Sequence, residues 1–332
     1  MEYKGIWTIA EAYEGDLKAV SFELLSRGRK LADELSEELV SVLIGGKVAR
    51  ERLEELIKRG ADRVIVIEDE KLDRFIVETY SNALIDLIKD RKPEIILSAA
   101  TVNGRTLMPH VAMKIHAGLT ADCTELGVEE DTRNLLQTRP AIGGNILATI
   151  KSPDSRPQMA TVRPKSSRPL EIDESREGVI ERIPFKAELY DQRVTHLETI
   201  SGGDEDVNIQ ESEIVVSGGK GMKKIDHFKM LYDLAHKMGG VVGASRDAVD
   251  RGWAKYPHQV GLSGKTVTPS VYFAFGISGA IQHLAGMKTA DTIISVNTDE
   301  EAAIFQVSDF GIVGDLFEVL PLLNEKLEKE VK

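Results

Sequence analysis

Hydrophobic positions change their spacing in a regular way along residues 6–116. Short apolar runs predict strands, and longer stretches with apolar residues three or four positions apart predict helices. We expect strands at residues 6–9, 39–44, 64–67 and 95–97, and helices at residues 17–38, 49–59, 75–89 and 104–116. Strands separated by helices of this length imply a parallel sheet with helices on both faces. The pattern therefore predicts an N-terminal three-layer α/β domain that resembles nucleotide-binding domains.

The spacing changes between residues 125 and 162. Strand-like runs at residues 135–138, 146–150 and 159–162 are short and separated by turn residues, which favours an antiparallel addition to the first sheet. Residues 168–206 are charged, contain Pro169 and Pro184, and end in Gly202-Gly203 followed by three acidic residues. This composition is typical of a linker. We expect Gly202–Asp206 to act as a hinge and divide the chain into domains 1–203 and 204–332.

Alternation of strands and helices starts again beyond this boundary. Strands are expected at residues 214–216, 241–242, 271–275, 292–296 and 310–313, and a helix at residues 224–238. The later strand runs are each followed closely by the start of a helix. The second domain is therefore expected to be a doubly wound α/β domain.

Composition and charge exclude several classes of protein and ligand. Hydrophobic residues make up 42% and charged residues 29% of the chain, which excludes a disordered chain. The formal net charge of −12 disfavours nucleic acid as a ligand. One cysteine, Cys123, and no apolar run long enough to span a bilayer predict a cytoplasmic protein without membrane insertion. The seven histidines show no metal-binding spacing, so we expect no metal site.

Clusters rich in Gly, Ser and Gln follow the strands of the second domain. They occupy residues 214–222, 242–247, 259–265 and 272–283, and Asn297 and Asp315 follow two further strands. The glycine-rich turn at Ser217–Gly221 fits either a tight strand-to-helix turn or a phosphate cradle. Because ligands bind outside the carboxyl ends of parallel strands, these clusters together favour a long phosphate-bearing ligand, such as a dinucleotide.

Four strings carry a more specific signal. They are Val242-Gly-Ala-Ser-Arg246, Gln259-Val-Gly261, Gly276-Ile-Ser-Gly-Ala-Ile-Gln-His-Leu-Ala-Gly286 and Phe305-Gln-Val-Ser-Asp-Phe-Gly-Ile-Val-Gly-Asp-Leu316. They resemble the electron transfer flavoprotein alpha subunit family, and the resemblance runs over essentially the whole chain. It implies a heterodimer with a beta subunit that contacts the N-terminal domain, and an FAD held mainly by the C-terminal domain.

The resemblance also implies a role for each matching position. Arg246 would lie over the flavin ring, and Ser263 and His283 would tune its potential with it. Ser263 stands where the family often has threonine, and Lys220 where it often has arginine. Residues 278–283 would line the pyrophosphate and the flavin, and three later residues the adenosine end. The implied FAD-binding residues are Lys220, Ser245, Arg246, Gln259, Val260, Gly261, Leu262, Ser263, Ser278, Gly279, Ala280, Ile281, Gln282, His283, Asn297, Asp315 and Leu316.

Two functions remain open. The first, which we favour, is an electron carrier without catalytic residues, serving acyl-CoA dehydrogenases and a quinone reductase. Flavin-bifurcating members of the family instead pass electrons from NADH towards ferredoxin and an acyl-CoA dehydrogenase. Residues 137–145 and 261–265 are similar to the versions found in anaerobes, where bifurcation is frequent. The second is a stand-alone dinucleotide-dependent oxidoreductase with its substrate between the domains, for which His283 is the only candidate proton donor.

Overall fold

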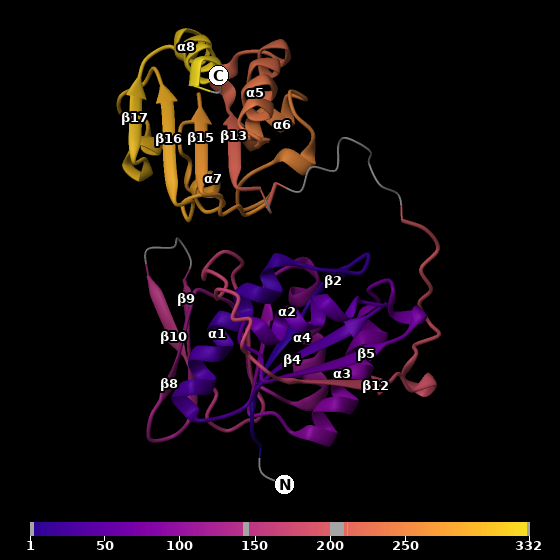
Figure 1. Ribbon diagram of the computed structural model, residues 1–332. Coiled ribbons are helices and arrows are strands. Elements are labelled where there is room, and N and C mark those ends of the chain that lie inside the picture. The colour runs from indigo at the N-terminus through magenta and orange to yellow at the C-terminus, as the bar shows by residue number, and fades with distance from the viewer. Residues whose placement is uncertain (1–2, 142–145, 200–208, 211, 331–332) are drawn as a thin grey trace. The chain divides into compact units, whose positions relative to one another are not determined.

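The computed structural model describes residues 3–141, 146–199, 209–210 and 212–330 (Figure 1). Contacts within the chain define two compact units, residues 1–199 and residues 200–332. The boundary that we predict between residues 203 and 204, and the hinge at Gly202–Asp206, lie outside the described residues. Each unit has its own sheet, and each is described by itself below.

The sheet of unit 1 has seven strands, all parallel. In sheet order they are β12 (Val179–Pro184), β5 (Arg63–Glu68), β4 (Leu39–Gly45), β1 (Ile6–Ala10), β6 (Ile95–Ala99), β11 (Gln158–Val162) and β7 (Leu119–Cys123). Its long helices are α1 (Ala19–Leu35), α2 (Arg50–Lys58), α3 (Val77–Arg91) and α4 (Val102–Ile115). A small hairpin, β2 (Ala12–Tyr13) and β3 (Asp16–Leu17), follows β1.

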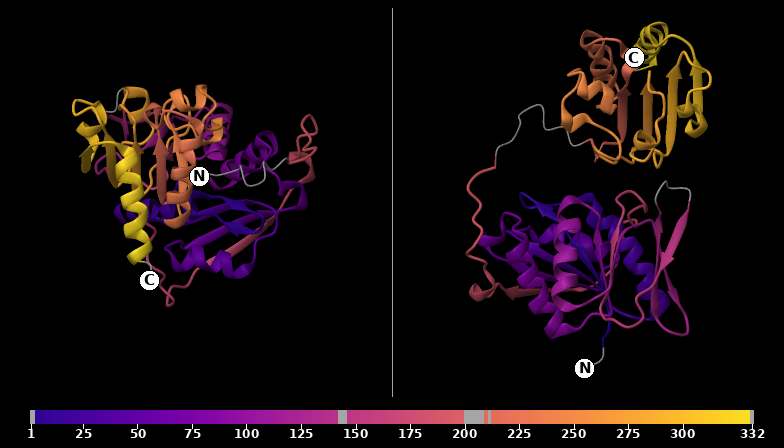
Figure 2. Two further views of the ribbon diagram at one scale, coloured as in Figure 1. Left: turned by 90° about the horizontal axis from the view of Figure 1, so that it is seen from above. Right: turned by 180° about the vertical axis from the view of Figure 1, so that it is seen from behind.

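Helices cover both faces of this sheet, as Figures 1 and 2 show. All seven residues of β4 are buried, and its apolar side chains are divided between two hydrophobic cores. Leu39 and Leu43 share a core with residues of α1 and α2, whereas Val40 and Val42 share the other core with residues of α3 and α4. Successive strand residues point to opposite faces, so this alternation makes β4 the centre of a three-layer fold. The predicted fold class is confirmed.

Two expectations for residues 125–206 are wrong. Only β8 (Glu125–Glu129), β9 (Asn134–Pro140) and β10 (Leu147–Ile150) form an antiparallel sheet, whereas β11 lies inside the parallel sheet between β6 and β7. The segment predicted as a linker contains β12, an edge strand parallel to β5. The sequence pattern did not predict this strand because it contains charged residues. In the structure Glu181 and Arg182 form ion pairs along the edge of the sheet and do not end the strand.

Unit 2 has a five-stranded parallel sheet. In sheet order the strands are β14 (Val241–Ala244), β13 (Ile214–Gly218), β15 (Val271–Phe275), β16 (Thr292–Asn297) and β17 (Phe310–Val313). The chain steps from β13 to β14 on one side and then returns to β15 on the other. This reversal creates a crevice between the ends of β13 and β15, which is where open α/β sheets bind ligands.

The two faces of this sheet are covered differently. Helices α5 (Ile225–Lys237) and α8 (Leu316–Glu330) share a core with Phe273 and Phe275. On the other face, Tyr272 and Ala274 pack against loop residues and the partly buried Leu284 of the short helix α7 (Ile281–Leu284). The α/β class of unit 2 is confirmed, with loops and short helices in place of long helices on the second face. None of the helices among the described residues is long and apolar enough to cross a membrane.

Candidate functional site

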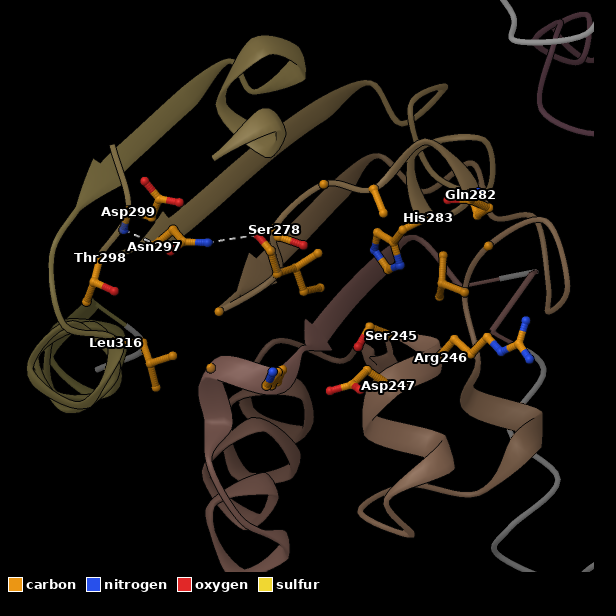
Figure 3. A pocket seen from close by; sticks show the side chains of 18 of the residues that line it. Ser245, Arg246, Asp247, Ser278, Gln282, His283, Asn297, Thr298, Asp299 and Leu316 are labelled. Atoms are coloured by element: carbon orange, nitrogen blue, oxygen red, sulfur yellow. Dashed lines mark hydrogen bonds between the residues drawn. The ribbon is translucent and has the colours of Figure 1, made fainter. Parts of the chain in front are cut away.

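A cavity of about 910 Å³ opens at the carboxyl ends of the unit 2 strands (Figure 3). This volume is at the upper end of the range for ligand pockets. Its walls come from the loops that follow all five strands and from the loop at residues 260–263. Figure 3 shows Arg246, Gln282 and His283 on one side and Asn297, Asp299 and Leu316 on the other. The pocket is therefore elongated along the edge of the sheet.

The structure brings together all but two of the residues expected to bind FAD. The exceptions are Gln259, which is 4% exposed behind the pocket wall, and Ile281, which is 73% exposed and does not line the pocket. The residues that do line it are Lys220, Ser245, Arg246, Val260, Gly261, Leu262, Ser263, Ser278, Gly279, Ala280, Gln282, His283, Asn297, Asp315 and Leu316. Which of them touch the cofactor stays a prediction.

Backbone-to-backbone contact between two loops forms the middle of the pocket. The Gly221 N–H donates to the Gly276 carbonyl at 3.0 Å, and the Gly219 N–H donates to the Phe275 carbonyl at 2.9 Å. A Cβ on Gly276 would lie 2.6 Å from the Gly221 Cα, and Gly276 has a φ of +61°. Only glycine allows both the left-handed conformation and this approach. The glycine-rich turn is thus part of the ligand pocket as well as a tight turn.

A second pair of loops forms the wall near Ser263. The Leu262 N–H donates to the Gln282 carbonyl at 2.7 Å, which ties this loop to α7. The buried Gln259 donates from Nε2 to the Ser263 Oγ at 3.1 Å. Gln259 therefore orients the hydroxyl that the resemblance places near the flavin, although its own side chain stands behind the wall.

Charged side chains of both signs lie around the pocket. Ser245 caps α6 (Arg246–Asp250) by accepting from the Ala248 N–H at 3.4 Å, which fixes the direction in which Arg246 leaves the helix. The Arg246 side chain is 71% exposed and its Nε lies 3.4 Å from an Asp250 carboxylate oxygen. Such an exposed pair is weak, so the guanidinium is free to approach a bound anionic group.

His283 is buried in the pocket wall and is neutral near pH 7. Its Nε2 lies 2.9 Å from the Tyr272 hydroxyl, and its Nδ1 has no hydrogen-bond partner among the described residues. Burial lowers the pKa of His283 to about 4, and the nearby Val260 carbonyl opposes this effect only in part. Without a bound ligand the imidazole therefore carries no charge that could balance an anion.

Asn297 and Asp315 shape the opposite end of the pocket through the backbone. The Asn297 side chain donates to the Ile277 carbonyl at 3.0 Å and accepts from the Asp299 N–H at 3.0 Å. An Asp315 carboxylate oxygen accepts from the Phe317 N–H at 2.9 Å and so caps α8. Both side chains hold the loops that would surround the adenosine end.

Nine lining residues are absent from the FAD-binding set that the resemblance implies. Four of them lie inside the clusters that the sequence places at strand ends, namely Gly221, Asp247, Gly276 and Ile277. Sequence reasoning missed the other five, and the acidic ones among them do not suggest a phosphate-bearing ligand. These five are Lys223, Asp250, Thr298, Asp299 and Gly314.

The residues present fit a flavin dinucleotide. The glycine cradle leaves backbone rather than side chains at the centre of the pocket, as a pyrophosphate requires. The buried, unpartnered Nδ1 of His283 is a polar atom that a ring acceptor could satisfy. The elongated shape would place the flavin ring at one end of the pocket and the adenosine at the other.

Comparisons with known proteins agree with this site. The family model described as "Electron transfer flavoprotein domain" matches residues 6–188, and the one described as "Electron transfer flavoprotein FAD-binding domain" matches residues 208–288. The chain is 48% identical over 333 residues to the electron transfer flavoprotein subunit alpha of Megasphaera elsdenii, covering 99% of this chain and 98% of that protein.

Two further relatives have more specific names. The acryloyl-CoA reductase electron transfer subunit beta of Anaerotignum propionicum is 40% identical over 355 residues, covering 98% of this chain and 96% of that protein. The lactate dehydrogenase (NAD(+),ferredoxin) subunit LctC of Acetobacterium woodii is 38% identical over 326 residues, covering 98% of this chain and 77% of that protein. The chain therefore belongs to the electron transfer flavoprotein family, as an alpha subunit with an FAD-binding domain in unit 2.

Proposed function

We propose that the unit 2 pocket holds the FAD and that the chain, joined to a beta subunit, carries electrons between protein partners. The observation that carries this proposal is an elongated pocket, built on a glycine cradle, at the reversal of strand order. Leu262 lines the pocket and is 74% exposed, so an apolar edge of the site is open to an approaching protein. FAD supplies the capacity to accept and release one or two electrons.

Each part of the pocket has a proposed task. Backbone N–H groups in the segment from Ser278 to Gln282, together with Lys220, would hold the pyrophosphate. Arg246 and Ser263 would contact the flavin ring, and Asn297 and Leu316 would enclose the adenosine end. A stand-alone oxidoreductase is not favoured, because the one histidine among the described lining residues is buried and bonded to Tyr272 rather than poised as a proton donor.

Arg246 should raise the reduction potential of the bound FAD. Reduction adds negative charge to the ring, and a unit charge about 4 Å away in water-like surroundings changes the energy by about 1 kcal/mol. For a two-electron couple this corresponds to roughly 20 mV. We therefore expect Arg246→Ala to lower the midpoint potential by at least that amount, measured by anaerobic redox titration of the heterodimer.

The matched control for this experiment is Arg246→Lys, which keeps the charge but not the planar fork. It should retain most of the potential. If the midpoint potential is the same in Arg246→Ala as in the parent protein, the proposed position of Arg246 at the flavin ring is wrong.

The names of the relatives indicate which protein partners this chain would have. We propose a beta subunit as the permanent partner and an acyl-CoA dehydrogenase as a redox partner, because one relative is an electron transfer subunit of an acryloyl-CoA reductase. The relative whose name includes NAD(+) and ferredoxin supports a bifurcating role for this chain as well. We place the heterodimer in the cytoplasm, in keeping with a single, buried and unpaired cysteine.

An anaerobic titration with NADH tests the bifurcating role. The chain is co-purified with its beta subunit, and the absorbance of the oxidised flavin is followed as NADH is added. We expect NADH to bleach the flavin. If the flavin absorbance does not change with NADH but is bleached by a reduced acyl-CoA dehydrogenase, the protein is instead a simple electron shuttle. Absence of any bound flavin would contradict the proposed site.

A further inference from the structure

Tyr272 lies beneath the pocket and contacts His283. It belongs to β15, its side chain is completely buried, and its ring centroid lies 6.1 Å from the imidazole centroid. The hydroxyl is 2.9 Å from the His283 Nε2, and this is the hydrogen bond found for it among the described residues. Figure 3 shows the side chain of His283, a residue of α7, extending into the pocket. The phenol is thus placed to act on the pocket through the histidine.

The direction of this hydrogen bond follows from the surroundings of the phenol. Burial raises the pKa of Tyr272 well above its usual value, so the hydroxyl keeps its proton. A phenol O–H is a stronger hydrogen-bond donor than the N–H of a neutral imidazole, and an imidazole nitrogen is a stronger acceptor than a phenol oxygen. The phenol proton is therefore directed to His283, which lies within hydrogen-bond distance. Nε2 then accepts, and in a neutral imidazole the proton must reside on Nδ1.

The proton on Nδ1 has no acceptor within hydrogen-bond geometry among the described residues. A buried donor left unsatisfied costs about 1–3 kcal/mol, so an acceptor atom of a ligand would gain by meeting it. Burial and the Val260 carbonyl account for the pKa of His283, and no charged side chain contributes to it. The charged groups that line the same pocket are Lys220, Lys223, Arg246, Asp247, Asp250, Asp299 and Asp315. Among the side chains of the described residues, Tyr272 is the hydrogen-bond partner of the imidazole, and it meets Nε2 rather than Nδ1.

We propose that Tyr272 is a positioning residue: its buried phenol holds His283 in the neutral tautomer protonated on Nδ1, so that His283 offers a hydrogen-bond donor rather than a cation to the oxidised cofactor. This inference rests on the FAD site proposed above. It differs from that proposal because the tautomer is a property of the chain alone and exists before any cofactor binds.

The first test measures the tautomer without FAD. The full chain, co-expressed with its beta subunit and labelled with 15N-histidine, is studied by NMR after FAD removal, and His283→Gln identifies the His283 signals among those of the seven histidines. The parent protein should show one tautomer with a protonated Nδ1 and no protonation down to about pH 5. Tyr272→Phe should give a mixture of tautomers. A protonated Nε2 in the parent, or the same spectrum in Tyr272→Phe, would overturn the proposal.

Ser295→Ala is the matched control. Ser295 is a buried residue of the neighbouring strand β16, and its hydroxyl accepts a hydrogen bond from Ser308 rather than contacting His283. This variant removes a buried hydroxyl from the same sheet, so its His283 spectrum should equal that of the parent. A change as large as that in Tyr272→Phe would show that any disturbance of the sheet moves the signal, and would overturn the specific role of Tyr272.

The second test measures the flavin potential in a double-mutant cycle. Tyr272→Phe should shift the midpoint potential of the FAD-loaded heterodimer and should have no effect when combined with His283→Gln. An equal shift in both backgrounds would mean that Tyr272 acts by packing alone. Thermal unfolding of each variant separates loss of folding from loss of tuning. If FAD fails to bind even the parent chain, the proposed function fails, whereas the NMR result still decides the tautomer.

Discussion

Gly276→Ala is expected to weaken FAD binding about a hundredfold. The substitution places a Cβ 2.6 Å from the Gly221 Cα and 2.9 Å from a methyl carbon of Leu316, at a residue with a φ of +61°. The left-handed conformation costs about 1 kcal/mol and the overlap costs about 2 kcal/mol more, because backbone rather than a flexible side chain must move. About 3 kcal/mol corresponds to two orders of magnitude in Kd.

Titration of the FAD-free heterodimer with FAD, followed by flavin fluorescence, checks this result. Gly239→Ala is the matched control, because Gly239 also has a positive φ, +65°, but nothing lies within 4 Å of the added Cβ. This control should be slightly less stable and should bind FAD normally. An unchanged Kd in Gly276→Ala would show that the contact between Gly276 and Gly221 does not form the cradle.

Arg133→Ala is expected to lower the free energy of unfolding of unit 1 by about 3 kcal/mol. The Arg133 guanidinium contacts Glu94 at 2.5 Å and Glu37 at 2.7 Å, and the Glu94 side chain is only 5% exposed. Hydrogen bonding to Glu94 is the main cause that raises the pKa of Arg133 above its usual value. Removing one partner of a buried pair leaves an uncompensated charge, which costs about 3–5 kcal/mol, and partial exposure of Arg133 places the result at the lower end.

Urea unfolding of the full chain, followed by circular dichroism, measures this loss. Arg50→Ala is the control, because the pair between Arg50 and Glu54 lies on the surface of α2 and should contribute about 0.5 kcal/mol or less. Adding Glu94→Gln to Arg133→Ala should restore part of the stability, because it removes the stranded charge. If both arginine variants lose equal stability, the buried pair is not the cause.

Much of the fold was predictable because local patterns reflect local burial. The strand expected at residues 271–275 has the same bounds as β15, and its residues are buried on both faces of the sheet. The position of β11 was not predictable, since its insertion between β6 and β7 depends on contacts with strands far away in the sequence. The edge strand β12 was missed because one of its edges faces solvent and its composition resembles a linker.

The site likewise contains some features that local sequence patterns predict and others that depend on contacts between distant residues. The rule that ligands bind at strand ends placed Ser245 and Asn297 at the pocket, because each follows a strand directly. Ile281, which the resemblance implies as an FAD-binding residue, does not line the pocket. It is the first residue of the single-turn helix α7 and is 73% exposed, and a turn this short has no periodicity to show which side is buried. The hydrogen bond between Tyr272 and His283 joins a strand to the short helix α7 eleven residues later, a contact that sequence spacing does not reveal.

The glycine cradle has a consequence for how members of this family can diverge. Its contacts are made by the backbone of Gly219, Gly221 and Gly276, whereas Arg246 and Ser263 reach the pocket from other loops. Under the function proposed above, retention of the cofactor and adjustment of its chemistry belong to different parts of the chain. We therefore expect substitutions at Arg246 or Ser263 to change the energy of a transferred electron while the protein keeps its cofactor, which would let one scaffold serve donors and acceptors of different reducing strength.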